Sequence, residues 1–170
     1  MRKLRAFFVV LKERFDRMDS YWIRLLVFGL INFGALGIGA YMMGEGPTSE
    51  WYQNANKAPW TPPGWVFGAA WFTIMICFSV YCAKVFTMDN KTGLMLFALS
   101  TVMNVIWNPL FFNWHQVGIA LVVIALLTIL IWFIVFKFKS MAGGYSVLVL
   151  PYGVWLLIAT SLNAFFLFKN

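Results

Sequence analysis

The chain has 170 residues, of which 62% are hydrophobic and only 11% are charged. Soluble domains carry about 25% charged residues, so this composition excludes an ordinary soluble protein and predicts an integral membrane protein. The net charge of +7 does not indicate a nucleic-acid partner, because seven of the 13 Lys and Arg residues lie before Leu25 and no basic–aromatic repeat follows them.

Residues 1–21 mix charged and apolar side chains. Phe7, Phe8, Leu11 and Phe15 can share one face of a helix, with basic side chains on the other face. This pattern predicts a basic amphipathic N-terminal extension that lies on an anionic membrane surface. The segment lacks the small-residue cleavage site of a secretory signal, so we expect it to face the cytoplasm.

Residues 22–170 contain five stretches with about the 20 apolar residues that a membrane-spanning helix requires. Helices satisfy their own backbone hydrogen bonds in lipid, so the sequence predicts an all-α membrane protein, a bundle of five transmembrane helices. A long loop rich in tryptophan and proline joins the first two. The predicted spans are 22–43, 65–86, 93–114, 117–136 and 145–168.

The distribution of basic residues predicts the orientation. With the N-terminus in the cytoplasm, eleven Lys and Arg residues lie on that side and only Lys57 and Lys169 lie on the other. The long loop and the C-terminus are therefore expected on the outer face. A bacterial cell membrane is the preferred location, with an organellar membrane as the alternative.

Few residues in the spans could carry out catalysis. No acidic residue falls within a span, which removes the usual basis of ion-coupled transport. The single histidine, His115, lies in a tight turn and is expected to be solvated. No nucleophile–base set and no metal-ligand spacing is present, so we expect no catalytic triad, no metal site and no required cofactor.

Amides and aromatic side chains remain as candidates at membrane depth. Asn104 lies in the third predicted span, and Asn163 lies in the fifth, eight residues after Trp155. Buried amides need partners, so one interpretation is hydrogen bonding between helices. The other is that they are polar anchors of an apolar, aromatic pocket for a small molecule.

Three motifs, in order, resemble the TspO/translocator protein family, also called tryptophan-rich sensory proteins or peripheral-type benzodiazepine receptors. The third span contributes NVIWNPLFF, from Asn104 to Phe112, and the fifth contributes PYGVWLLIATSLN, from Pro151 to Asn163. The loop contributes Trp51, Tyr52, Lys57, Pro59, Trp60, Pro62, Pro63, Trp65, Phe67 and Trp71. The resemblance covers the chain from about Trp22 onward.

The resemblance implies a five-helix receptor or carrier whose pocket is closed by the first loop, often as a homodimer. Its ligands would be tetrapyrroles such as protoporphyrin IX or haem-type molecules, and other apolar compounds, in a sensory, regulatory or transport role. An apolar ring would stack between indoles, and its propionates could meet Lys57, loop backbone amides or amide side chains. The implied ligand-binding residues are Trp60, Phe67, Trp71, Asn104, Trp107, Tyr152, Trp155, Ala159 and Asn163.

The chain departs from the family pattern at three positions. Met75 stands where members usually have a tyrosine, and Ala58 separates the Lys–Pro pair of the loop. Ala164 replaces the tyrosine of a C-terminal motif associated with sterols, which argues against sterol binding.

Two other functions compete with the receptor or carrier. One is an enzyme that degrades porphyrin in a light- and oxygen-dependent reaction, with Trp71 or Trp155 as redox participants. The other is an interaction protein whose loop docks a partner. The small pair Ala35 and Gly39 in the first span suits either close packing within the chain or a dimer contact.

Overall fold

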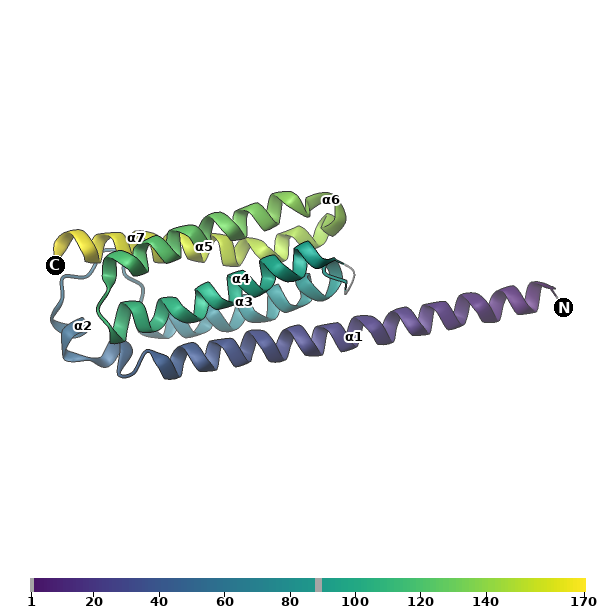
Figure 1. Cartoon of the computed structure of the whole chain (residues 1–170), viewed down its shortest axis with the longest axis horizontal. Coiled ribbons are helices and arrows are strands. Elements are labelled where there is room, and N and C mark those ends of the chain that lie inside the picture. The colour runs from purple at the N-terminus through teal and green to yellow at the C-terminus, as the bar shows by residue number, and fades with distance from the viewer. Residues whose placement is uncertain (1, 88–89) are drawn as a thin grey trace.

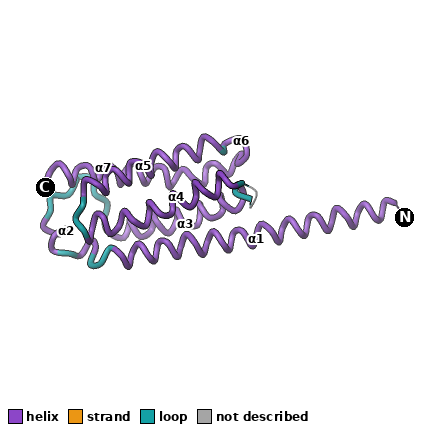
Figure 2. The backbone as a smooth tube through the Cα atoms, viewed as in Figure 1, coloured by secondary structure: helices purple, strands orange, loops and turns teal. Residues whose placement is uncertain are grey.

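The computed structural model describes the backbone of residues 2–87 and 90–170, and the side chains of 20–87 and 90–170. Within these residues all regular structure is helical, as Figure 2 shows, and the predicted fold class is confirmed. Five segments are long and apolar enough to cross a membrane: Ser20–Thr48, Gly64–Val85, Lys91–Asn113, Val117–Lys137 and Lys139–Lys169.

The first segment begins within α1 (Arg2–Met42), one helix by its backbone, and continues through the turn after it into η1 (Gly46–Thr48). The amphipathic surface expected for residues 1–21 depends on side chains outside the described set. The other long helices are α3 (Gly64–Val85), α4 (Lys91–Asn108), α5 (Val117–Lys137) and α7 (Leu150–Lys169). Short helices connect them: η1 (Gly46–Thr48), α2 (Glu50–Asn54), η2 (Pro109–Asn113), α6 (Lys139–Ala142) and η3 (Gly143–Val149).

Two prolines explain where helix geometry changes. The segment η2 is a π-helix that opens with Pro109, which has no N–H for the carbonyl of Val105. The side chain of Asn108 substitutes, its Nδ2 donating to the carbonyls of Asn104 at 3.0 Å and Val105 at 3.5 Å. In the last span Pro151 lies in the first turn of α7, where its missing N–H costs no intrahelical bond.

The five long helices run side by side (Figure 1), and the contacts between them close into a ring. Helix α1 contacts α3 and α4, α4 contacts α5, α5 contacts α7, and α7 returns to α3. Each helix therefore has two neighbours within the ring, and the side chains that point inward decide whether the centre is filled or hollow.

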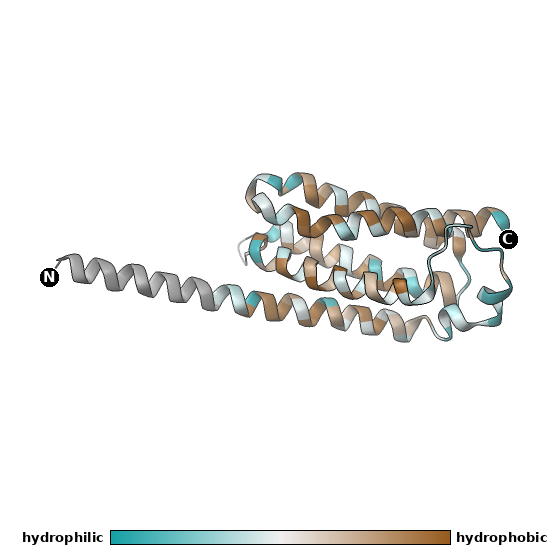
Figure 3. Ribbon diagram, turned by 180° about the vertical axis from the view of Figure 1, so that it is seen from behind, coloured by the Kyte–Doolittle hydropathy of each residue, from teal (hydrophilic) through white to brown (hydrophobic). Residues whose placement is uncertain are grey.

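Aromatic side chains fill the ring at the end away from the long loop. Tyr81 and Phe86 are fully buried there, and the rings of Phe28 and Phe97 meet edge to face with centroids 4.8 Å apart. Apolar residues predominate along the long helices, and polar residues are concentrated at the helix ends and in the loop (Figure 3). The hollow part of the ring lies at the loop end.

Candidate functional site

A cavity of about 490 Å³ lies inside the ring beneath the α1–α3 loop. Its walls come mainly from α1, α3, α4 and α7, with Ile124 of α5 and Phe112 of η2, and the loop segment between η1 and α3 forms its roof. The wall from α1 carries small or flexible side chains, and the wall from α3 includes two glycines. The lining residues from these two helices are Ala35, Leu36, Ala40, Met43, Gly64, Phe67, Gly68 and Trp71.

Aromatic rings in edge and stacked contacts shape the other walls. Phe67 of α3 meets Trp155 of α7 with centroids 5.3 Å apart and planes at 82°. Trp107 of α4 stacks on Phe111 of the π-helix at 5.4 Å and 21°. These contacts leave a cavity whose surface is predominantly apolar and aromatic, as in most small-molecule sites.

The two candidate asparagines play different roles. Asn163 joins three elements, because its Oδ1 accepts from the Trp107 indole N–H at 3.0 Å and its Nδ2 donates to the carbonyl of Val117 at 3.1 Å. Asn104 is 7% exposed and lines the cavity. None of the described residues hydrogen-bonds to its side-chain amide. Of the two interpretations, Asn163 therefore fits interhelical bonding and Asn104 fits a polar anchor.

The roof of the cavity is fixed to the α5–α7 side of the ring. Trp51 of α2 stacks on His115 at 4.1 Å and 16°, and Tyr52 stacks on Phe166 at 5.8 Å and 4°. The stacking gives His115, an exposed residue with a positive φ of 53°, a role in fixing the loop that the sequence did not indicate.

Hydrogen bonds hold the loop to the end of α7. The Asn170 side chain pairs with the backbone of the loop, since Oδ1 accepts from the Asn56 N–H at 2.8 Å and Nδ2 donates to the Asn56 carbonyl at 3.2 Å. The Asn56 side chain donates to the Lys169 carbonyl at 3.2 Å. One turn of the loop onward, the Trp60 indole donates to Ser161 at 3.1 Å.

The structure brings most, but not all, of the predicted site residues to the cavity. Tyr152 is 2% exposed and does not line the large cavity; its ring packs against Trp71, with the ring centroids 5.9 Å apart. Trp60 is 53% exposed and packs on the outside of α7. Asn163 lines only a smaller adjoining cavity of about 50 Å³. The six that line the large cavity are Phe67, Trp71, Asn104, Trp107, Trp155 and Ala159.

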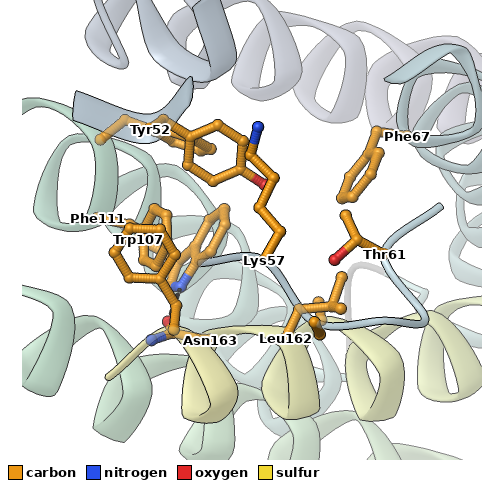
Figure 4. Close-up of a pocket in the computed structure, with 12 residues that line it drawn as sticks. Tyr52, Lys57, Thr61, Phe67, Trp107, Phe111, Leu162 and Asn163 are labelled. Atoms are coloured by element: carbon orange, nitrogen blue, oxygen red, sulfur yellow. Dashed lines mark hydrogen bonds between the residues drawn. The ribbon is translucent and has the colours of Figure 1, made fainter. Parts of the chain in front are cut away.

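The smaller cavity adjoins the large one between the loop and α7 (Figure 4). Tyr52, Lys57 and Thr61 line both cavities. The loop motif contained Tyr52 and Lys57, so its signal could have identified them as site residues. Nothing in the sequence indicated Thr61 or the α1 wall, because small residues in an apolar span carry no pattern of their own.

Two positions that depart from the family pattern, and the small pair in α1, are buried. Met75 and Ala58 are 2% and 6% exposed. Gly39 faces α4, where an added Cβ would lie 2.7 Å from Asn108 Nδ2, and Ala35 lines the cavity. This pair is therefore used in packing within the chain.

A second open space of about 560 Å³ lies at the loop end, outside the ring, beside Glu45, Glu50 and His115. Among the described residues no three His, Cys, Asp or Glu side chains are grouped to hold a metal ion. We therefore consider the cavity inside the ring as the candidate ligand site.

Comparison with known proteins identifies relatives of this chain. A family model described as the TspO/MBR family matches residues 26–168. The tryptophan-rich protein TspO of Chlorobaculum tepidum is 31% identical over 134 residues, covering 76% of this chain and 85% of that protein. The translocator protein of Homo sapiens is 29% identical over 159 residues, covering 86% of this chain and 89% of its own length.

Proposed function

We propose that this chain, which belongs to the TspO/MBR family, is a membrane receptor or carrier that binds a tetrapyrrole in the cavity beneath its α1–α3 loop. Protoporphyrin IX is the ligand we propose for testing. Other flat apolar molecules would use the same walls. Binding would serve a sensory, regulatory or transport role, and the protein itself would need no resident cofactor.

The observation that carries the proposal is the Asn104 amide, which faces an aromatic cavity without a partner among the described residues. Its amide atoms are not among the fully buried unpartnered ones, so they are open to the cavity, where a ligand can supply the hydrogen-bond partners that the described residues do not. The cavity volume of about 490 Å³ lies within the usual range for small-molecule sites.

The aromatic walls support a flat ligand. Trp71, Trp107 and Trp155 all reach the cavity, and they come from three different helices of the ring. Stacked aromatic pairs gain about 0.5–1.5 kcal/mol beyond the apolar area that they bury. A tetrapyrrole ring offers a large π-face for such contacts, and its polar edge groups can meet an amide or an indole N–H.

Tryptophan-fluorescence titration of the purified protein with protoporphyrin IX tests the proposal. We expect saturable quenching in the wild type, and weaker affinity in Trp71→Ala and Trp155→Ala. Trp22→Ala and Trp114→Ala are matched controls, because both indoles are more than half exposed and neither lines the cavity. Equal affinity in all four variants would refute the site.

Light-dependent degradation of the bound porphyrin is the second candidate function. It is favoured by the placement of two oxidisable indoles, Trp71 and Trp155, in the wall of one cavity. Illuminating the protein–porphyrin mixture in air tests it. The enzyme is supported if a new absorbing product forms in larger amount than in a no-protein control and in smaller amount with Trp71→Phe. If the product does not exceed the control, the enzyme is rejected and the receptor or carrier is retained.

We also propose a homodimer, on the strength of the family. Helix α1 offers Gly29, Gly34 and Gly37, where an added Cβ would meet nothing within 4 Å. Small residues allow helices from two copies to approach closely. Crosslinking in detergent should give a dimer that Gly34→Leu weakens, and an unchanged yield would exclude this face.

A further inference from the structure

Charge is unevenly distributed over the two adjoining cavities. Among the described residues, Lys57 is the only charged one that lines either cavity, and it lines both. Its side chain extends from the loop across the space shown in Figure 4, between Tyr52 and Thr61. The junction of the two cavities thus carries a positive charge, whereas the remainder of the lining is neutral.

The ammonium group of Lys57 has only neutral partners in the described structure. Its Nζ donates to Gln53 Oε1 at 3.3 Å and lies 5.0 Å from the centroid of the Tyr52 ring. The amide contact is long for a hydrogen bond, and an amide oxygen carries no net charge, so a carboxylate would add a Coulombic attraction that neither present partner supplies. The junction could therefore exchange these contacts for an anionic group of a ligand.

Two hydroxyl groups lie at the same junction. The side-chain oxygens of Tyr52 and Thr61 have no hydrogen-bond partner among the described residues, although both residues line both cavities. Burial raises the pKa of Tyr52 above its usual value, so its phenol stays protonated and can donate. An ammonium and two hydroxyls together form a set of donors, and none of the described acidic residues lines either cavity.

The part of the large cavity that the smaller one does not share differs in chemistry. Asn104, Trp71 and Trp155 offer neutral polar atoms in an aromatic wall. A ligand with an apolar body and an anionic group at one edge would match both parts at once. Its body would fill the large cavity, and its anionic edge would point toward the loop.

We propose that Lys57, with Tyr52 and Thr61, selects ligands that carry a carboxylate at one edge of a large flat apolar body, and fixes that edge beneath the loop. This inference rests on the proposed function and specifies which chemical form of the ligand the site prefers. Free porphyrin acids would bind in preference to their esters.

A purely structural role for Lys57 makes a different prediction. If its contacts with Gln53 and Tyr52 serve only to brace the loop, removing the ammonium would weaken every ligand equally. If it recognises a carboxylate, the loss would fall on the acid and spare the ester. The combination of variant and ligand therefore separates the two roles.

The experiment compares protoporphyrin IX with its dimethyl ester by fluorescence titration in uncharged detergent micelles. We expect the wild type to bind the acid about tenfold more tightly than the ester. This ratio corresponds to the lower end of the free energy of a hydrogen bond to a charged group. Lys57→Met should remove this preference by weakening only the acid, and Lys57→Arg should retain most of it. Lys169→Met, an exposed change at the same end of the bundle, is the control.

Each outcome bears on one proposal. If Lys57→Met weakened the affinity for acid and ester equally, or if the wild type showed no preference for the acid, the role of Lys57 would be overturned. Saturable binding in the same titrations would still support the site. A wild type that bound neither form would instead refute the proposed function. Added salt should weaken the acid more than the ester, because only the acid's binding includes a charge pair that ions screen.

Discussion

The two asparagines of the ring, Asn104 and Asn163, allow a test in which one substitution has opposite consequences. Leucine has the same number and branching of side-chain heavy atoms as asparagine and has no polar atoms. Asn163→Leu removes the acceptor for the Trp107 indole and the donor to the Val117 carbonyl. Asn104→Leu removes an amide that bonds to none of the described side chains or backbone groups.

The structure gives the expected magnitudes. Interhelical hydrogen bonds in membrane proteins are worth about 0.6 kcal/mol on average and up to about 1.7 kcal/mol. With two bonds lost and the Trp107 indole left buried, Asn163→Leu should destabilise the fold by about 2 kcal/mol. For a chain of this length that corresponds to a fall in Tm of about 4–8 °C.

Asn104→Leu should leave Tm unchanged or raise it, because no bond is broken and a buried polar group becomes apolar. Its porphyrin affinity should fall by about 1 kcal/mol, or roughly fivefold, because the ligand loses one hydrogen-bonding group. Thermal unfolding in detergent measures the first quantity, and the fluorescence titration measures the second. If Asn104→Leu lowered Tm as much as Asn163→Leu does, the distinction between an anchor and a structural amide would be wrong.

Three further predictions concern the roof and the helix contacts. Asn170→Ala removes the side chain that pairs with the loop backbone. We therefore expect porphyrin to dissociate several-fold faster from this variant, as measured by stopped-flow fluorescence. An unchanged dissociation rate would show that the loop does not gate ligand exchange. Gly68→Leu adds bulk to the cavity wall where a Cβ meets nothing within 4 Å, so porphyrin titration should show weak binding at an unaltered Tm. Gly39→Ala forces a Cβ to within 2.7 Å of Asn108 Nδ2 and should cost about 1–3 kcal/mol by thermal unfolding, whereas Gly29→Ala, in open space, should be neutral.

The asymmetry of the bundle explains how one fold can combine stability with the proposed binding site. At the end away from the loop, buried rings such as Tyr81 and Phe86 pack the centre closely. At the loop end the ring is hollow, and the roof is held by stacking and by the Asn56–Asn170 bonds. A packed half can maintain the positions of the helices while the other half admits a ligand.

The sequence by itself determined the fold class, the number of spans and the family. Length and hydropathy are enough for the spans, because lipid admits only helices that satisfy their own backbone groups. The motifs also directed attention to the loop and to Asn104, Trp107 and Trp155, since aromatic and amide side chains are conspicuous in apolar helices.

Only the tertiary structure decided which way each side chain faces. A uniformly apolar helix has no polar face, so its rotation about its own axis is set by its neighbours. For that reason the sequence could not distinguish the bonded Asn163 from the unpartnered Asn104, or foresee that Trp60 turns outward to Ser161. The sequence also could not predict that α1 forms one wall of the cavity. Small side chains leave a space only where the neighbouring helix does not fill it, so the tertiary packing decides.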